Sequence, residues 1–186
     1  LLYLMEQGWT HARIEKLLYK QSGLLGVSGI SADMRRLREE AGKGNEDARR
    51  AIAQFTHRVV RESGALVACL GGLDVLAFSG GIGEHDVALR EQVCTRLAWL
   101  GIHMDWQRNR EADGKEAYAI HAPDSAVEVE RALDAGAFDP AAIGAAWRGA
   151  RFAVLGIGRV QFGQCAVQHL LREAARERLQ HRVQVF

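Results

Sequence analysis

Two common nucleotide-binding signatures are missing from this sequence, and so is any apolar run of membrane-spanning length. No GxGxxG pattern follows an expected strand, so a Rossmann dinucleotide fold is not indicated. No glycine-rich loop ends in Gly-Lys-Ser or Gly-Lys-Thr, so a P-loop is not indicated either. A membrane-spanning helix needs about 20 consecutive apolar residues, which the chain does not contain. We therefore expect no membrane partner.

Cysteine is scarce, and charge of neither sign is in large excess. The three cysteines, Cys69, Cys94 and Cys165, are odd in number and lie far apart, without the spacing of metal ligands. We interpret them as buried thiols in a reducing compartment. A net charge of +1 gives no basic surplus for nucleic acid, so no such partner is expected. Without a recognisable secretory signal, the expected localisation is cytoplasmic.

The chain also lacks an initiating methionine. Residues 1–5 already follow a helical pattern, and chains seldom begin inside an element. We therefore expect a fragment whose upstream part is missing. Its 186 residues are enough for one sizeable domain or for half of a larger enzyme.

The most informative stretch of the sequence is VLAFSGGIGEHD, at residues 75–86. Its apolar start predicts a short buried strand, and Gly80, Gly81 and Gly83 predict a sharp turn after it. Residues 87–100 then follow helical spacing. A strand, glycine turn and helix let the backbone approach a ligand and aim N–H groups at phosphate or ribose oxygens. The alternative is a plain chain reversal, which these residues alone favour.

A second glycine-containing stretch precedes an expected helix. Residues 23–31 combine three glycines with apolar side chains and predict a tight, partly buried loop. Ser31 is expected to cap a helix that starts at Ala32. Asp33 would then lie in the first turn, where a carboxylate suits the helix dipole. Without further context, Asp33 is a helix-start charge and Arg35 a solvated residue.

Helical and extended patterns alternate along the remaining chain. Gly8 is expected to close a first helix and Thr10 to cap a second. A long helix should begin at Gly44 or Asn45 and run to Leu70, where two glycines stop it. Further expected elements are short strands at 101–105, 126–129 and 152–157, and a helix at 166–179.

Four strings of the sequence together resemble a known family. They are LLYLMEQG, KLLYKQSGLLGVSGISADMRRL, GGLDVLAFSGGIGEHDVALREQVCTRLAWLGI and APDSAVEV. In order and spacing they are similar to the C-terminal half of acetate kinases, over about residues 1–129. The resemblance implies an α/β fold: the C-terminal domain of the actin-like, sugar-kinase-like (ribonuclease H-like) ATPase superfamily, truncated at its N-terminus.

The activity that the resemblance implies is transfer of the γ-phosphoryl group of ATP to acetate. The family uses Mg²⁺ and works as homodimers joined largely through this domain. Its catalytic aspartate, phosphate-contacting arginines and histidine, and phosphate loop precede the region matched here, so the missing N-terminal half carries the catalysis. We therefore assign no catalytic residue and no metal ligand. The alternatives are a kinase for propionate or another short carboxylate, and a non-catalytic nucleotide-binding or dimerisation module.

Two segments are expected to contact the nucleotide. The resemblance implies this, because they match the family's segment that contacts the adenosine and its segment that wraps around the nucleotide. These residues are Asp33, Met34 and Arg35, and Gly81, Ile82, Gly83, Glu84 and His85. The family usually has asparagine at the position of His85. Both side chains form hydrogen bonds, so one contact is altered and the expected pocket remains.

The end of the chain departs from the family. After residue 129 the family continues with Pro-Thr-x-Glu-Glu, in which one glutamate binds Mg²⁺, and no matching glutamate appears here. Residues 131–186 contain eight arginines and no lysine. We therefore divide the chain into a family domain, 1–130, and a divergent tail, 131–186. We favour a shifted reading frame, so that the tail shares little buried surface with the domain; the alternative is a lineage-specific extension.

Overall fold

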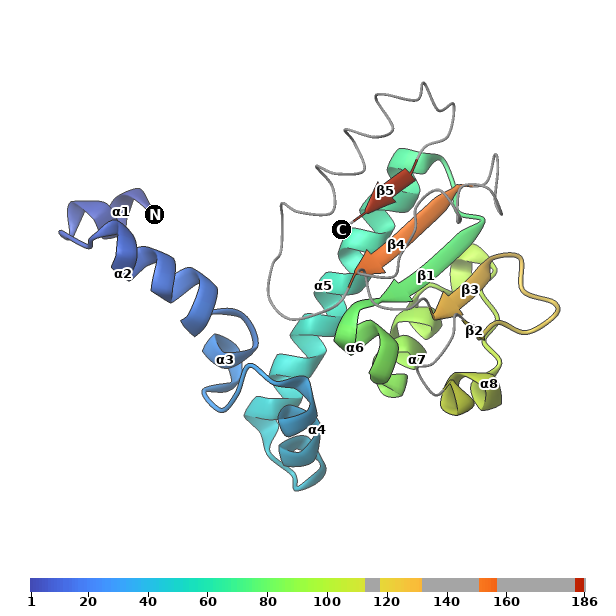
Figure 1. The fold of residues 1–186 in the computed structure, drawn as a ribbon, viewed down its shortest axis with the longest axis horizontal. Coiled ribbons are helices and arrows are strands. Elements are labelled where there is room, and N and C mark those ends of the chain that lie inside the picture. The colour runs from blue at the N-terminus through green and yellow to red at the C-terminus, as the bar shows by residue number, and fades with distance from the viewer. Residues whose placement is uncertain (113–117, 132–150, 157–182, 186) are drawn as a thin grey trace. The chain divides into compact units, whose positions relative to one another are not determined.

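The chain forms two compact units, which are described separately. A computed structural model describes residues 1–112, 118–131, 151–156 and 183–185 (Figure 1). The first unit comprises residues 1–58 and the second residues 59–186, so the boundary falls inside a long helix. The first unit is helical, whereas the second combines helices with a mainly parallel sheet. An α/β fold is therefore present, as the sequence predicts.

Short helices follow one another in the first unit. Gly8, with φ of +76°, follows the first helix, and the Thr10 side chain accepts a hydrogen bond from the Arg13 N–H at 3.3 Å to cap the second. Both predictions are confirmed. The helices are α1 (Leu2–Glu6), α2 (His11–Lys16), the π-helical turn η1 (Leu17–Gln21), α3 (Gly23–Ser28), α4 (Met34–Gly42) and the first part of α5 (Glu46–Leu70).

Two expectations for residues 23–36 are wrong. Residues 23–28 form helix α3 rather than a loop, with positive φ at Gly23 and Gly29 on either side. Helix α4 begins at Met34 and not at Ala32. Asp33 is its N-cap, with extended φ and ψ of −89° and 119°, and its Oδ1 accepts from the Arg35 N–H at 2.9 Å. An aspartate at that position satisfies a free N–H of the first turn, so it displaces Ser31 as the cap.

The long helix α5 is confirmed. Asn45 caps it by accepting from the Ala48 N–H at 3.0 Å, and Gly71 and Gly72, with φ of +72° and +136°, follow its end. Among the described residues, no helix is both long and apolar enough to span a membrane.

The cysteines differ from one another. Cys69 lies on α5 and is exposed, so the expectation of a buried thiol is wrong there: its position turns toward solvent rather than toward the apolar stripe. Cys94 is buried, as expected, and its burial raises the pKa of its thiol to about 12. Cys165 lies outside the described residues.

The five-stranded sheet of the second unit has the predicted apolar strand at its centre. All five residues of β1 are buried, and β1 pairs in parallel with β3 on one side and β4 on the other (Figure 1). β5 extends the sheet in parallel beyond β4, and β2 pairs antiparallel with β3. The strands, in sheet order, are β2 (Tyr118–Ala119), β3 (Glu128–Arg131), β1 (Val75–Ser79), β4 (Phe152–Gly156) and β5 (Val183–Val185).

Helices connect β1 to the next strands. They are α6 (Gly80–His85), α7 (Val87–Arg96), the 3₁₀ turn η2 (Ala98–Leu100) and α8 (Trp106–Glu111). The short strand expected at 101–105 is reduced to one bridge between Met104 and His121. The strand expected at 126–129 begins later, at Glu128, because pairing with β1 starts at Val75.

The tail contributes directly to this sheet. β4 confirms the predicted strand over residues 152–156 and pairs with all five positions of β1. Ala153 and Leu155 are only 1% and 3% exposed. The expectation that the tail shares little buried surface with the preceding residues is therefore wrong for this strand. The helix expected at 166–179 lies outside the described residues.

An ion pair joins the start of β4 to the start of β1. The Arg151 backbone N–H and Nε donate to Asp74 Oδ2 at 2.6 and 3.0 Å, and Nη2 donates to Oδ1 at 2.6 Å. Nη1 also donates to the Gly71 carbonyl at 2.8 Å. A bidentate guanidinium–carboxylate pair fixes geometry as well as charge. It therefore holds the first residues of the tail strand beside the end of α5.

Removing this pair should weaken the attachment of β4. We expect Arg151→Ala to lower the free energy of unfolding only modestly, since the pair is partly exposed to solvent and is screened there. Arg96→Ala, at an exposed arginine of α7, is the matched control and should change it by less than about 0.5 kcal/mol. Urea unfolding measures both. Equal effects would show that Arg151 does not anchor the strand.

The same pair should make stability depend on acid pH. Its hydrogen bonds from Arg151 hold the pKa of Asp74 below its ordinary value of 3.8. Such a carboxylate stabilises the fold above its unfolded pKa, and this contribution is lost as pH falls through the lower folded value. In Arg151→Ala the Asp74 part of the acid destabilisation should shrink, because the guanidinium bonds are lost while the backbone N–H of residue 151 still donates to Asp74. Parallel stability curves for the two proteins below about pH 4 would contradict this.

Candidate functional site

The topology of the sheet points to one edge as a ligand site. The chain passes from β1 to β3 on one side and then crosses to β4 on the other. These strands are parallel, so their carboxyl ends lie along the same edge, where α6 begins (Figure 1). In open α/β sheets, ligands bind outside the carboxyl ends of strands where the strand order reverses. The sheet thus places residues 80–85 at such a position.

The glycine stretch at this edge is a helix rather than the expected sharp turn. Gly80 alone of its three glycines has a positive φ, +74°, while Gly81 and Gly83 belong to α6 with ordinary φ. The Glu84 carboxylate accepts from the Gly80 N–H at 3.1 Å across the first turn. This bond gives the first N–H of the helix a partner inside the segment, which favours the helical conformation.

The two helical glycines have different surroundings. A Cβ added at Gly83 would lie 3.4 Å from the Phe78 carbonyl carbon and 3.6 Å from the Leu155 oxygen, so a methyl group would be in van der Waals contact with β1 and β4 and a larger side chain would meet them. A Cβ at Gly81 would meet no described atom within 4 Å, and Gly81 is exposed. Gly81 is therefore the position at which a ligand can approach the backbone.

Side chains of the segment point to different environments. Glu84 is only 6% exposed, and its hydrogen bond to Gly80 directs it back into the segment. His85 has a side chain that is 66% exposed, with its Nε2 3.9 Å from Glu84 Oε2. Ile82 is half-buried. The accessible part of this segment thus consists of the Gly81 backbone and the His85 imidazole.

The adenosine-contacting segment expected from the resemblance lies in the first unit. Arg35 Nη2 and Asp33 Oδ2 are 3.0 Å apart, and hydrogen bonds from Arg35 hold the pKa of Asp33 below its ordinary value. The Arg35 side chain is 82% exposed and that of Asp33 48%, whereas Met34 is 4% exposed. Asp33 and Arg35 therefore offer polar groups to a ligand, and Met34 fixes the start of α4 in the core.

A buried arginine that the sequence did not predict lies behind the second segment. Arg90, on α7, is fully buried, and its Nη1 donates to the carbonyls of Gly83 and Glu84 at 2.8 and 2.6 Å. Its Nε and Nη2 donate to the side-chain and backbone oxygens of Asn109 on α8, at 2.6 and 3.0 Å. Burial, followed by the nearby charge of Arg131, lowers the pKa of Arg90 to about 10.

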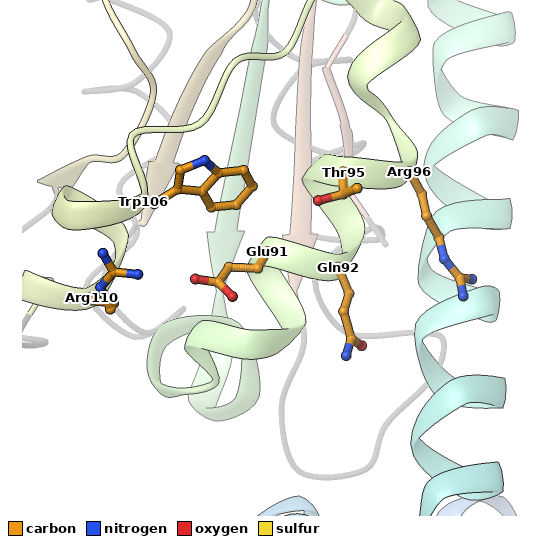
Figure 2. A pocket seen from close by; sticks show the side chains of 6 residues that line it. All are labelled: Glu91, Gln92, Thr95, Arg96, Trp106 and Arg110. Atoms are coloured by element: carbon orange, nitrogen blue, oxygen red, sulfur yellow. The ribbon is translucent and has the colours of Figure 1, made fainter.

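A separate pocket of about 500 Å³ lies on α7 and α8 (Figure 2). Figure 2 shows the Trp106 ring facing α7 and the Arg96 side chain pointing away from the Trp106 ring. None of the expected nucleotide-contacting residues lines this pocket, so we base the candidate site on the carboxyl edge of the sheet. The lining residues are Glu91, Gln92, Thr95, Arg96, Trp106 and Arg110.

Metal binding has little support from the donor set. Within the described residues, no three histidines, cysteines, aspartates or glutamates are grouped so that they could hold an ion. At the carboxyl edge, the Glu84 carboxylate is already engaged with Gly80. The residues described here therefore do not form a protein cage for Mg²⁺.

Comparison with known proteins gives one consistent family. The model of the acetokinase family matches residues 1–133. Acetate kinase from Rhodopseudomonas palustris (strain TIE-1) is 51% identical over 127 residues, which are 68% of this chain and 31% of that protein. Acetate kinase from Porphyromonas gingivalis (strain W83) is 43% identical over 130 residues, 69% of this chain and 32% of that protein. The chain spans about a third of the length of these curated relatives.

Solved structures agree. The crystal structure of Porphyromonas gingivalis acetate kinase matches with a TM-score of 0.65 and 40% identity, covering 71% of this chain and 33% of that one. A propionate kinase from Francisella tularensis matches with a TM-score of 0.61 and 34% identity, covering 72% of this chain and 33% of that one. The fold is thus that of the acetate and propionate kinases, within the actin-like ATPase superfamily, as expected.

The conformational difference between Gly80 and Gly81 can be tested directly. Gly80→Ala should lower the free energy of unfolding by about 1–2 kcal/mol, because an L-residue resists a positive φ. Gly81→Ala should leave it unchanged or raise it by up to about 1 kcal/mol, since alanine favours a helix. Urea unfolding of the two variants provides the comparison. Equal losses would indicate a turn instead of helix α6.

Proposed function

The chain belongs to the acetokinase family, and we propose that it is the nucleotide-binding, dimer-forming C-terminal part of an acetate kinase. The complete enzyme would transfer the γ-phosphoryl group of ATP to acetate, giving ADP and acetyl phosphate. The observation that carries the proposal is the family match over residues 1–133. Because the chain spans about a third of its relatives, the activity is proposed for the complete protein.

The contribution of this chain would be to bind and orient ATP. At the carboxyl edge of the sheet, exposed Gly81 leaves room for a ligand against the backbone, and His85 adds an exposed hydrogen-bonding ring. The carboxylate of Asp33, kept ionised by Arg35, is suited to accept hydrogen bonds from hydroxyl or amino groups of adenosine. Within its own unit, buried Met34 would support the contacts of Asp33 and Arg35, and buried Gly83 and Glu84, with half-buried Ile82, would support those of Gly81 and His85.

Phosphoryl transfer itself would depend on groups outside this chain. Catalysis of this reaction is mainly positioning and neutralisation of the phosphoryl oxygens by cations. Mg²⁺ would supply part of that neutralisation when bound to the ATP phosphates, and the described residues do not form a cage for it. We therefore assign this chain the nucleotide contacts and no proton or phosphoryl transfer step.

Similarity to a propionate kinase supports one alternative to acetate as the phosphoryl acceptor. The similarity to a propionate kinase structure is close in extent to the similarity to acetate kinase structures, so propionate or another short carboxylate is the alternative acceptor. From a different class, a non-catalytic nucleotide-binding or dimerisation module remains the other alternative. A cytoplasmic homodimer joined through this domain completes the proposal.

The isolated chain should have no acetate kinase activity, because the groups that would carry the reaction lie outside it. A hydroxamate assay with acetate, ATP and Mg²⁺ measures this. We expect no turnover above background. A rate above roughly 1 s⁻¹, within the usual range of enzymes, would show that the described units contain catalytic groups.

Nucleotide binding should depend on the two named segments. Gly83→Val is a poor test, since the larger side chain would disturb the packing on Phe78 and Leu155. Gly81→Val faces open space, so it should preserve the fold and block the approach of ATP, lowering affinity at least about tenfold, or about 1.4 kcal/mol. Arg35→Ala should weaken binding less.

Isothermal titration calorimetry with Mg·ATP measures these affinities, and Arg49→Ala, at an exposed arginine outside both segments, is the control. Unchanged affinity in Gly81→Val, with wild-type binding intact, would reject this location for the nucleotide. Binding of ATP without turnover in the complete protein would favour the non-catalytic alternative.

A further inference from the structure

Arg90 has an unusual position for a charged residue. It is fully buried between α6, α7 and α8, and its three guanidinium nitrogens all donate hydrogen bonds to oxygens of the protein. Burying a charge is costly unless it is hydrogen-bonded, and an apolar residue of similar size often packs at less cost. The particular acceptors of Arg90 therefore indicate what it does.

Two of these acceptors are carbonyls at the end of α6. The last carbonyls of a helix lack donors within the helix, and α6 has only six residues. The Asp86 N–H donates to one of them, the Ile82 carbonyl, at 2.9 Å. The Arg90 Nη1 donates to the next two, the carbonyls of Gly83 and Glu84. A cation at the negative end of the helix is also electrostatically favourable.

The other acceptors belong to one residue of α8. Asn109 is fully buried, accepts from Arg90 through both its side-chain and its backbone oxygen, and donates to the Val87 carbonyl at 3.2 Å. Arg90 and Asn109 together thus connect the end of α6 with the start of α7 and with α8. The Glu84 carboxylate holds the opposite end of α6 through Gly80. The segment is therefore braced at both ends by buried side chains.

We propose that Arg90 is a positioning residue for nucleotide binding: by bonding the Gly83 and Glu84 carbonyls and Asn109, it fixes the orientation of the Gly81–His85 backbone at the carboxyl edge. This inference rests on the proposed function and goes beyond it, because Arg90 is outside both expected segments. Arg90 would not touch the nucleotide. Its effect would pass through the carbonyls that it holds and through the exposed His85 next to them.

Hydrogen exchange tests the structural half of the inference on the 186-residue chain without ligand. Arg90→Met keeps much of the side-chain length and removes the donors. We expect the amides of residues 83–86 to exchange at least about tenfold faster, since hydrogen bonds to charged groups are among the stronger ones. Asn109→Ala, which removes one acceptor and leaves the carbonyl bonds, should have a smaller effect. Arg96→Met on the same helix should have none.

Calorimetry with Mg·ATP tests the functional half. Arg90→Met should lower affinity at least about tenfold, and Arg90→Lys, which keeps a cation for the two carbonyls, should recover part of it. Val93→Ala is the control for stability, because it removes a buried contact from the same helix and leaves the Arg90 bonds in place. Each variant is measured below its own unfolding transition, as followed by circular dichroism.

The outcomes separate the two claims. Suppose that the wild-type chain binds ATP. If Arg90→Met then binds ATP as tightly as the wild type does, or loses no more affinity than Val93→Ala does, the positioning role is overturned and the proposed function stands. If wild type does not bind ATP, the proposed function fails, and the positioning role for nucleotide fails with it. Unchanged exchange at residues 83–86 in Arg90→Met would overturn the bracing itself, whatever the affinity.

Discussion

The burial of β1 is the constraint on which the second unit depends. All five of its residues are inaccessible, and its backbone must be paired on both sides because unpaired buried N–H and C=O groups are costly. β4 supplies pairs for all five residues and β3 for Val75 to Phe78. Since both partners are parallel to β1, three carboxyl ends lie along one edge. The candidate site follows from this arrangement, because the chain leaves β1 there as α6.

The helix at that edge shows how packing refines a local pattern. Gly80 needs its glycine for a positive φ, and Gly83 lies where a side chain larger than a methyl group would meet β1 and β4. Gly81 has neither constraint from the described residues, which makes it the position open to a ligand. Buried Glu84 and Arg90 then hold the two ends. Side chains that never reach the surface thus determine how the exposed backbone is presented.

The tail strand changes how the C-terminal part is interpreted. Family similarity ends at about residue 133, yet β4 lies farther along the chain and completes one side of β1. Arg151 reinforces that pairing through Asp74, 77 residues earlier in the sequence. A tail that never packs on the domain does not fit these contacts. Whether the strand arose by a frame change or as an extension, it occupies a position that β1 requires to be filled.

Local interactions were predictable from the sequence alone: the apolar strand at 75–79, the cap at Thr10, the start of α5 after Gly44 or Asn45, and the glycines after α5. The family was also recognisable, because long glycine-containing strings retain their order and spacing. The sequence did not show that residues 80–85 are helical, although the bond between Glu84 and Gly80 is local. Tertiary structure alone decided that Arg90 is buried. It also decided that β4 pairs with β1. Arg90 bonds Asn109, 19 residues away, and Arg151 beside β4 bonds Asp74, 77 residues away. Hydrophobic periodicity reports only neighbours within a few residues, so it could not show these contacts.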